Sequence, residues 1–220
     1  MDFAALRLSV LLSALTTIAL LILGLPIAHW LTTTRRRWKI LVEAIVALPL
    51  VLPPTVLGFY LLVAFGPRAP IGHAFVIATG RTLAFSFEGL LLASILYSLP
   101  FAVQPFAAAL ARVDRRLVEA SYTLGESRLQ TFRRVTLPLA LPGVVAGAVL
   151  AFAHTLGEFG VVLMVGGNLP GETRTLSISI YDAVEQLDYA AAGHTSLLLL
   201  AVSFVVLVLT YALQRRSLLG

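Results

Sequence analysis

The chain has 220 residues, of which 59% are hydrophobic and only 12% are charged, and its mean hydropathy is +0.93. Soluble domains are about one quarter charged, so this composition argues against a soluble protein and for the membrane class. The absence of cysteine excludes disulfides, thiolate catalysis and cysteine-bound metals. The net charge of +5 could suit nucleic acid, but in a membrane protein it more often reflects cationic residues gathered on one side.

Five long apolar runs follow one another along a single domain, 1–220. They cover 8–31, 40–65, 89–111, 139–165 and 195–213. Each is long enough to cross a hydrocarbon core of about 30 Å at 1.5 Å per residue, and backbone groups in lipid must bond within their own segment. We therefore predict an all-α integral membrane protein with five transmembrane helices. The first run is too long for a signal-peptide core, so it is expected to be a retained span.

Prolines are concentrated in the second and third runs, at Pro49, Pro53, Pro54, Pro100 and Pro105. Each removes a backbone donor and disfavours the preceding helical turn, so both helices are expected to be kinked or broken. A packing kink would explain any single proline. Five in two neighbouring spans favour a mobile pathway, since broken helices are tolerated where they face protein or water.

Most of the sixteen cationic residues fall in three segments that five spans place on one side, namely 35–39, 112–134 and 215–216. The positive-inside rule makes that side cytoplasmic, so the N-terminus is expected outside and the C-terminus inside. A sixth span could lie only in 69–87. Arg81 interrupts that segment, and its apolar stretches are too short.

A polar, arginine-rich segment, 112–138, separates the third and fourth runs. Its first part fits a short helix from Asp114 to Leu124, whose apolar stripe would comprise Leu117, Ala120, Ser121 and Leu124. Gly125 suits the left-handed conformation that ends a helix.

A second helix is predicted in the same segment. Ser127 and Gln130 have the spacing of a capping box, Pro138 is expected to end the helix, and Pro142 suits the first turn of the fourth span. Its apolar face would comprise Leu129, Phe132 and Val135. Two such helices around a glycine form a knob that can enter a groove on a partner. A loop lying on its own bundle or on anionic lipid headgroups is the alternative.

Two ionisable residues, His154 and Glu158, lie four positions apart in the fourth run. A carboxylate is costly in hydrocarbon, so Glu158 is expected to face the bundle interior near the external interface. It could line a gate, pair with an external arginine or a helix N-terminus, or reach water. The neighbouring residues that could line a route or allow close helix approach are Thr155, Gly157, Phe159 and Gly160.

The segment 168–194 is expected to lie outside. Apolar residues recur in it at helical spacing, at Leu176, Ile180, Ala183, Val184 and Leu187. This pattern predicts a short amphipathic helix, which either rests at the membrane interface or lines a gate.

Catalytic signatures are missing from the sequence. Lys39 is the only lysine and follows Trp38, so a phosphate-binding Gly-x-x-x-x-Gly-Lys-Ser/Thr loop is impossible. The four histidines form no His-Glu-x-x-His pair, and no Gly-x-Ser-x-Gly elbow occurs. We therefore expect no enzyme activity and no cofactor in this chain. If ATP drives its function, ATP and Mg²⁺ must bind to another chain.

The polar segment resembles the cytoplasmic docking loop of ABC importer permeases, written in that family as Glu-Ala-Ala, three residues, Gly, nine residues, Ile-x-Leu-Pro. Five positions match at the set distances: Glu119, Ala120, Gly125, Leu137 and Pro138. Two positions depart mildly, with Ser121 for the second Ala and Val135 for the Ile. The resemblance implies a type I importer permease fold, with a coupling helix that includes Ser121 and Leu124 and inserts into a cytoplasmic ATPase subunit.

The segments 157–160, 166–176 and 180–182 are similar to the molybdate branch of that family, with sulfate and tungstate permeases as close relatives. The resemblance implies a homodimer in the bacterial inner membrane, two ATPase subunits inside, and an external binding protein that delivers the oxyanion. It also implies alternating access. The rival readings are an ion-coupled transporter or channel, for which no inverted repeat is apparent, and a membrane-embedded hydrolase.

Overall fold

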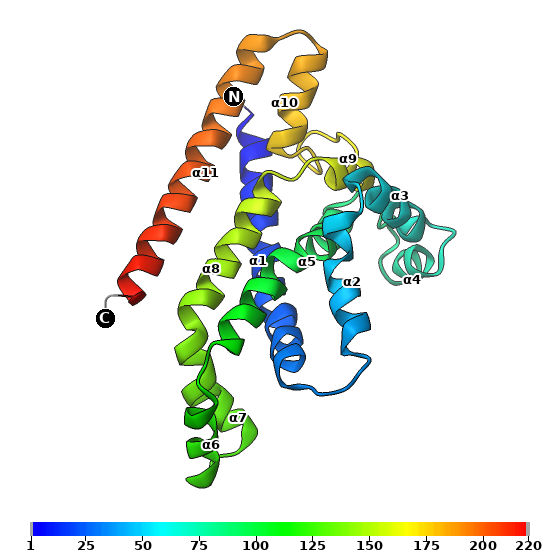
Figure 1. Cartoon of the computed structure of the whole chain (residues 1–220). Coiled ribbons are helices and arrows are strands. Elements are labelled where there is room, and N and C mark those ends of the chain that lie inside the picture. The colour runs from blue at the N-terminus through cyan, green and yellow to red at the C-terminus, as the bar shows by residue number, and fades with distance from the viewer. Residues whose placement is uncertain (1, 219–220) are drawn as a thin grey trace.

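The computed structural model describes residues 2–218, and their side chains except those at positions 209, 210 and 212–218. All regular elements in this range are helices (Figure 1). In chain order they are α1 (Phe3–Thr33), α2 (Lys39–Val51), α3 (Pro54–Phe65), α4 (Pro70–Thr79), α5 (Phe87–Ala111), α6 (Arg115–Thr123), α7 (Arg128–Thr131), a π-helical turn η1 (Phe132–Thr136), α8 (Leu137–Leu156), α9 (Gly160–Gly166), α10 (Leu176–Glu185) and α11 (Tyr189–Leu218).

The long helices α1, α5 and α8 lie side by side and enclose the main apolar core (Figure 1). Small residues set how closely they approach. A Cβ atom at Gly143 would lie 2.5 Å from Ala109 of α5, and one at Gly147 would lie 2.8 Å from the ring of Phe106. Glycine at both positions of α8 therefore allows α5 to lie against its backbone, as is common between helices in lipid.

The second predicted span, 40–65, is not one continuous helix. It divides into α2 and α3, which meet at an angle of 112°. The break falls at Leu52 and Pro53, and Pro54 opens α3 at a position where a missing amide costs nothing. The predicted break is confirmed here. The third span differs, because α5 runs without interruption through Pro100 and Pro105. Of the two predicted outcomes, a kink or a break, the break is therefore wrong and the kink stays a prediction.

The fourth predicted span, 139–165, does not coincide with one continuous helix. Helical structure already begins at Arg128 and continues through η1 and past Pro138 to Leu156. Pro138 does not end a helix, because it occupies the first turn of α8 directly after a π turn. Pro142 lies inside α8 and not in its first turn. The rod then stops at Gly157, and the short helix α9 follows after a three-residue break.

The described chain has four helices long and apolar enough to cross a membrane, and five if the bent α2–α3 pair counts as one span. The turn between α1 and α2 and the pair α6–α7 lie at the same end of the bundle, and α10 lies at the other end (Figure 1). Two of the three cationic segments, 35–39 and 112–134, therefore share one end. The third, 215–216, has no described side chains.

Candidate functional site

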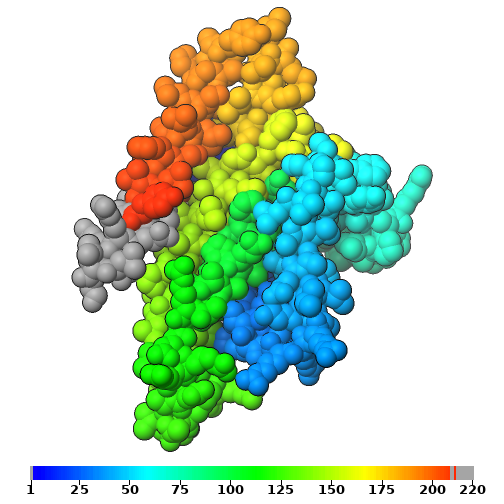
Figure 2. Space-filling view, in the orientation of Figure 1, coloured from blue at the N-terminus to red at the C-terminus, as the bar shows by residue number. Residues whose placement is uncertain are grey.

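The first candidate site is the knob formed by α6, α7 and their linker, 114–131, which projects beyond the bundle (Figure 2). Asp114 caps α6 by accepting a hydrogen bond from the amide of Arg116 at 2.9 Å. At the other end Gly125 has φ +86° and donates its amide to the carbonyl of Tyr122. No atom lies within 4 Å of where a Cβ would be, so the glycine is required by its left-handed backbone and not by lack of space.

The linker leads directly into a capping box at the start of α7. The Ser127 amide donates to Gln130 Oε1 at 2.8 Å, and the Gln130 amide donates to Ser127 Oγ at 3.4 Å. This confirms the predicted capping box. Since both ends of the turn have their backbone donors paired, the knob has a defined shape although it lies outside the core.

Polar contacts hold α6 and the linker against α7 and η1, which begin the continuous helical segment 128–156. The hydroxyls of Ser121 and Thr131 are 2.9 Å apart and both side chains are buried. The carboxylate of Glu126 forms an ion pair with Arg134. The two helices therefore form one unit, held by groups that a sequence pattern does not single out.

The apolar side chains of the knob are turned outward. Leu124 is 84% exposed, and Leu117, Tyr122 and Leu129 are also exposed. The predicted stripe is thus divided, because Ser121 faces the rod while Ala120 and the two leucines face solvent. Glu119 is exposed and makes no ion pair within the described part of the chain. Farther along the motif, Leu137 is half-buried against the core and Pro138 is exposed.

The second candidate site lies where α5 faces the end of α8. Thr155 is buried, donates its hydroxyl to the carbonyl of Ala151 at 2.9 Å, and lies 2.8 Å from the hydroxyl of Ser98. One residue earlier, the ring of His154 stacks on Phe101 at 3.7 Å and lies 5.0 Å from the ring of Tyr97. Two neighbouring residues of α8 therefore meet polar and aromatic partners on α5.

Glu158 lies in the break between α8 and α9 and is only 4% exposed. Among the described residues, neither of its carboxylate oxygens has a hydrogen-bond partner, nor does the hydroxyl of Ser94. Of the three alternatives for Glu158, the one in which its side chain reaches water does not fit this burial. Within the described residues it also makes no ion pair with arginine.

Sequence reasoning missed the partners on α5. Ser94, Tyr97, Ser98 and Phe101 recur at steps of three and four, which places them on one face of that helix. This spacing is the sequence signal for a polar and aromatic face on α5. Which face of α8 they would meet depends on tertiary packing.

The remaining predicted residues surround the same break. A Cβ at Gly160 would lie 2.7 Å from Pro54 of α3, and one at Gly58 of α3 would lie 2.7 Å from Met164 of α9. The bent second span therefore packs tightly on α9 through two glycines. Gly157 ends α8, and a Cβ there would lie 3.8 Å from the carbonyl oxygen of Ala153, which is ordinary contact. Phe159 lies 5.0 Å from Tyr181 of α10.

The helix predicted in the external segment is α10, whose Leu176 and Ile178 are buried while Val184 is exposed. Its amide at Leu176 donates to Ser9 Oγ of α1 at 2.8 Å. The helix is therefore anchored on α1, close to the break that carries Phe159.

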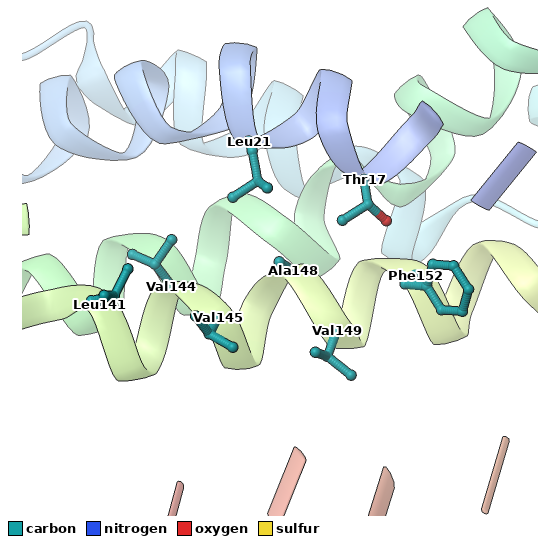
Figure 3. A pocket seen from close by; sticks show the side chains of 8 residues that line it. All are labelled: Thr17, Leu21, Leu141, Val144, Val145, Ala148, Val149 and Phe152. Carbon is teal, nitrogen blue, oxygen red and sulfur yellow. The ribbon is translucent and has the colours of Figure 1, made fainter. Parts of the chain in front are cut away.

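An apolar groove of about 380 Å³ runs between α1 and α8 (Figure 3). Its only polar lining residue is Thr17, whose hydroxyl is already donated to the carbonyl of Ser13 at 2.7 Å. Binding an anion needs several hydrogen-bond donors or arginines. The described lining of this groove therefore offers no group that would bind an oxyanion.

The bundle, the broken spans and the projecting knob together define a permease subunit of an ABC importer. Two solved structures share the fold: the MetNI methionine ABC transporter, with a TM-score of 0.76 at 19% identity over 98% of this chain and 95% of that one, and a bacterial ABC transporter that imports alginate, with a TM-score of 0.75 at 18% identity over 97% and 79%. The family described as "Binding-protein-dependent transport system inner membrane component" matches residues 20–218, and the chain belongs to it.

Within this family the chain is similar to the "Molybdenum transport system permease protein ModB" of several organisms. The protein of Azotobacter vinelandii is 50% identical over 97% of this chain and 95% of its own length. Those of Escherichia coli K12 and Mycobacterium tuberculosis are 37% and 44% identical, over 98% and 92% of this chain and 95% and 76% of their own lengths.

Proposed function

We propose that this chain is the membrane-spanning permease subunit of an ATP-driven molybdate importer, which works by alternating access after an external binding protein delivers the oxyanion. The observation that carries this proposal is the likeness to molybdenum permeases along almost the whole chain. The exposed, internally fastened knob supports the ATP-driven part of the proposal, because it is a surface prepared for a partner.

The energy enters through the knob. The residues that carry this role are those of the docking motif, Glu119, Ala120, Ser121, Leu124, Gly125, Leu137 and Pro138. Leu124 and its exposed neighbours supply the apolar contact, and Gly125 and Ser121 hold the shape. Leu137 and Pro138 connect this surface to α8, so that movement of an ATPase subunit reaches a helix of the bundle.

ATP and Mg²⁺ bind to the partner ATPase subunits, and this chain itself is not an enzyme and needs no cofactor. Its single lysine supports this division. Lys39 lies at the first residue of α2 and forms an ion pair with Glu43 at 3.3 Å, in no glycine-rich loop. The assembly consists of two copies of this chain, two cytoplasmic ATPase subunits and one external oxyanion-binding protein. The helices of this chain are in contact with membrane lipid. The assembly has no nucleic-acid partner, and the N-terminus of this chain lies outside.

The gate of the pathway lies at the break after α8. His154, Thr155, Gly157, Glu158, Phe159 and Gly160 belong to it. The support comes from three features: a helix interruption, a buried carboxyl group without regular hydrogen bonds, and tight packing on a second broken span. A helix interruption with an unpaired buried carboxyl group changes shape at lower cost than a continuous helix, because fewer hydrogen bonds have to break.

Uptake by cells that lack other oxyanion importers tests the proposal. Cells producing this chain with the ATPase subunits and binding protein are expected to accumulate labelled molybdate in an ATP-dependent manner. Accumulation of sulfate or tungstate in preference to molybdate would reassign the substrate within the same class. Uptake that persists without any ATPase subunit would overturn the importer assignment in favour of an ion-coupled transporter or channel.

A further inference from the structure

The π-helical turn η1 contains one residue more than the same turn of an α-helix would contain. The amide of Leu137 donates to the carbonyl of Phe132, five residues back, whereas an α-helical bond spans four. Burial shows the same feature. Thr131 and Thr136 are buried five positions apart, while Thr136, Ala140 and Val144 follow at steps of four. The extra residue therefore lies between the knob and the transmembrane part of α8.

Pro138 favours this wide turn. It has no amide to donate, and in regular α geometry its ring would clash with the carbonyl of Arg134, four residues earlier. A π turn moves that carbonyl away. Such turns are rare, bend helices, and occur frequently at functional sites.

Contacts on both sides of the turn connect it to the knob and to the bundle. Thr131, the last residue of the knob, lies directly before the turn and holds Ser121 of α6. Phe132, its first residue, packs against the ring of His29 of α1 with the ring centres 4.6 Å apart, and against the main core. A change in the turn would therefore alter the position of the knob relative to α1 and α8 together.

We propose that η1 is the joint about which the knob turns relative to α8 during the transport cycle. Conversion of the turn to α geometry at constant chain length would rotate the knob by about 100° around the rod and extend the rod by about 1.5 Å, the rotation and rise of one residue. This inference rests on the proposed docking of the knob to an ATPase subunit. The two arrangements are the states between which ATP binding and hydrolysis would drive the permease.

Deletion of Arg133 tests the joint directly. Its side chain is exposed and makes no ion pair among the described residues. The deletion leaves Thr131 and Thr136 four positions apart, which is the spacing of a regular α-helix. The knob should therefore keep its orientation, but the helix loses the extra residue that forms the π turn. Arg133→Ala keeps the length and serves as the matched control.

Both variants are purified with their ATPase subunits and reconstituted into liposomes with the binding protein. We expect the deletion variant to retain the ATPase subunits but to lose molybdate uptake per ATP hydrolysed by about 5-fold to 150-fold, the usual range of coupling between two sites. Arg133→Ala is expected to behave as the unaltered protein. Unchanged uptake per ATP in the deletion variant would overturn the joint.

A distance measurement gives a readout that a merely structural role would not change. Spin labels are attached through Arg116→Cys on α6 and Leu150→Cys on α8, both exposed positions. We expect the distance to change between nucleotide-free and ATP-bound complexes of the unaltered protein, and to stay constant in the deletion variant. An equal change in both would contradict the proposal.

Two further variants keep the outcomes separable. If the deletion variant fails to assemble, Pro138→Ala tests the joint in its place, because alanine restores the amide that α geometry needs. A fall in molybdate uptake per ATP in that variant supports the joint. Unchanged uptake per ATP overturns it. The docking role itself is tested by Leu124→Asp. If the ATPase subunits still bind to that variant, the proposed function fails, whereas normal coupling in the deletion variant alone removes only the joint.

Discussion

The knob and the intramembrane break satisfy their polar and apolar groups in opposite ways. In the knob, the buried hydroxyls of Ser121 and Thr131 are paired and one carboxylate oxygen of Glu126 pairs with Arg134, while the apolar side chain of Leu124 is exposed. At the break, apolar groups are covered, while the carboxyl group of Glu158 and the hydroxyl of Ser94 are buried without regular hydrogen bonds. The knob therefore has a stable shape but exposes apolar side chains to solvent. The break covers its apolar side chains but buries polar groups at a cost in free energy.

This difference indicates different roles for the two regions. A rigid element with exposed apolar side chains gains free energy by binding a partner, because the shape is already paid for by its own hydrogen bonds. A buried polar group without partners is stabilised when the structure opens, because water or another polar group can then form a hydrogen bond with it. The knob is therefore suited to bind a partner that moves it, and the break is suited to change its conformation in response. Four substitutions test this contrast.

The largest effect is expected from Leu124→Asp in the knob. A charge at the centre of an apolar contact should weaken ATPase binding by roughly 2 kcal/mol or more, which is about 30-fold. Co-purification of the ATPase subunits measures it. Leu187→Asp is the matched control, since Leu187 is also exposed but lies at the opposite end, after α10. Equal retention of the subunits by both variants would remove the contrast.

At the break, Gly160→Ala should destabilise the fold. Its Cβ would lie 2.7 Å from Pro54, and such overpacking typically costs about 1–3 kcal/mol. Thermal unfolding of the purified protein in detergent should show a lower midpoint. Gly157→Ala, where the nearest atom is 3.8 Å away, controls for the loss of a glycine. If the two variants unfold alike, the tight packing of α3 on α9 is not what stabilises this region.

Gly125→Val should distort the knob without affecting membrane insertion. A branched residue with a left-handed backbone costs about 1–2 kcal/mol, and the linker can relieve that strain by moving the apolar surface. Binding of the ATPase subunits and ATP-driven uptake should both fall, while the amount of protein in the membrane stays the same. Gly193→Val provides a comparison at an open position that is not among the residues with positive φ. Normal ATP-driven uptake by Gly125→Val would count against the docking role.

The smallest effect is expected from Glu158→Gln. The amide retains the size of the side chain but cannot ionise, so the cost of opening the break changes while its packing does not. The basal rate of ATP hydrolysis without binding protein should change several-fold, by about 1 kcal/mol. Glu172→Gln, at an exposed position in the neighbouring loop, should leave the rate unaltered. An unchanged rate in both variants would favour a structural role for Glu158 over a gate.

The sequence predicted these two regions unequally. The helix from Asp114, the glycine at its end and the capping box at Ser127 were all predicted, because each depends on residues within a few positions of one another. The outward direction of Leu124 and the inward direction of Ser121 were not, since they depend on contact with Thr131 of the following rod. The apolar stripe was therefore assigned to one face although the structure divides it.

The sequence by itself determined the membrane class, the five apolar runs and the capped shape of the knob, because hydropathy, length and capping act locally along the chain. Tertiary structure alone decided that α8 stops at Gly157, that Glu158 is enclosed, that Ser98 meets Thr155, and that α8 extends through a π turn toward the knob. Those features depend on which helix faces overlap and how closely glycines let them approach. Such overlaps involve residues far apart in the chain, which no local pattern encodes.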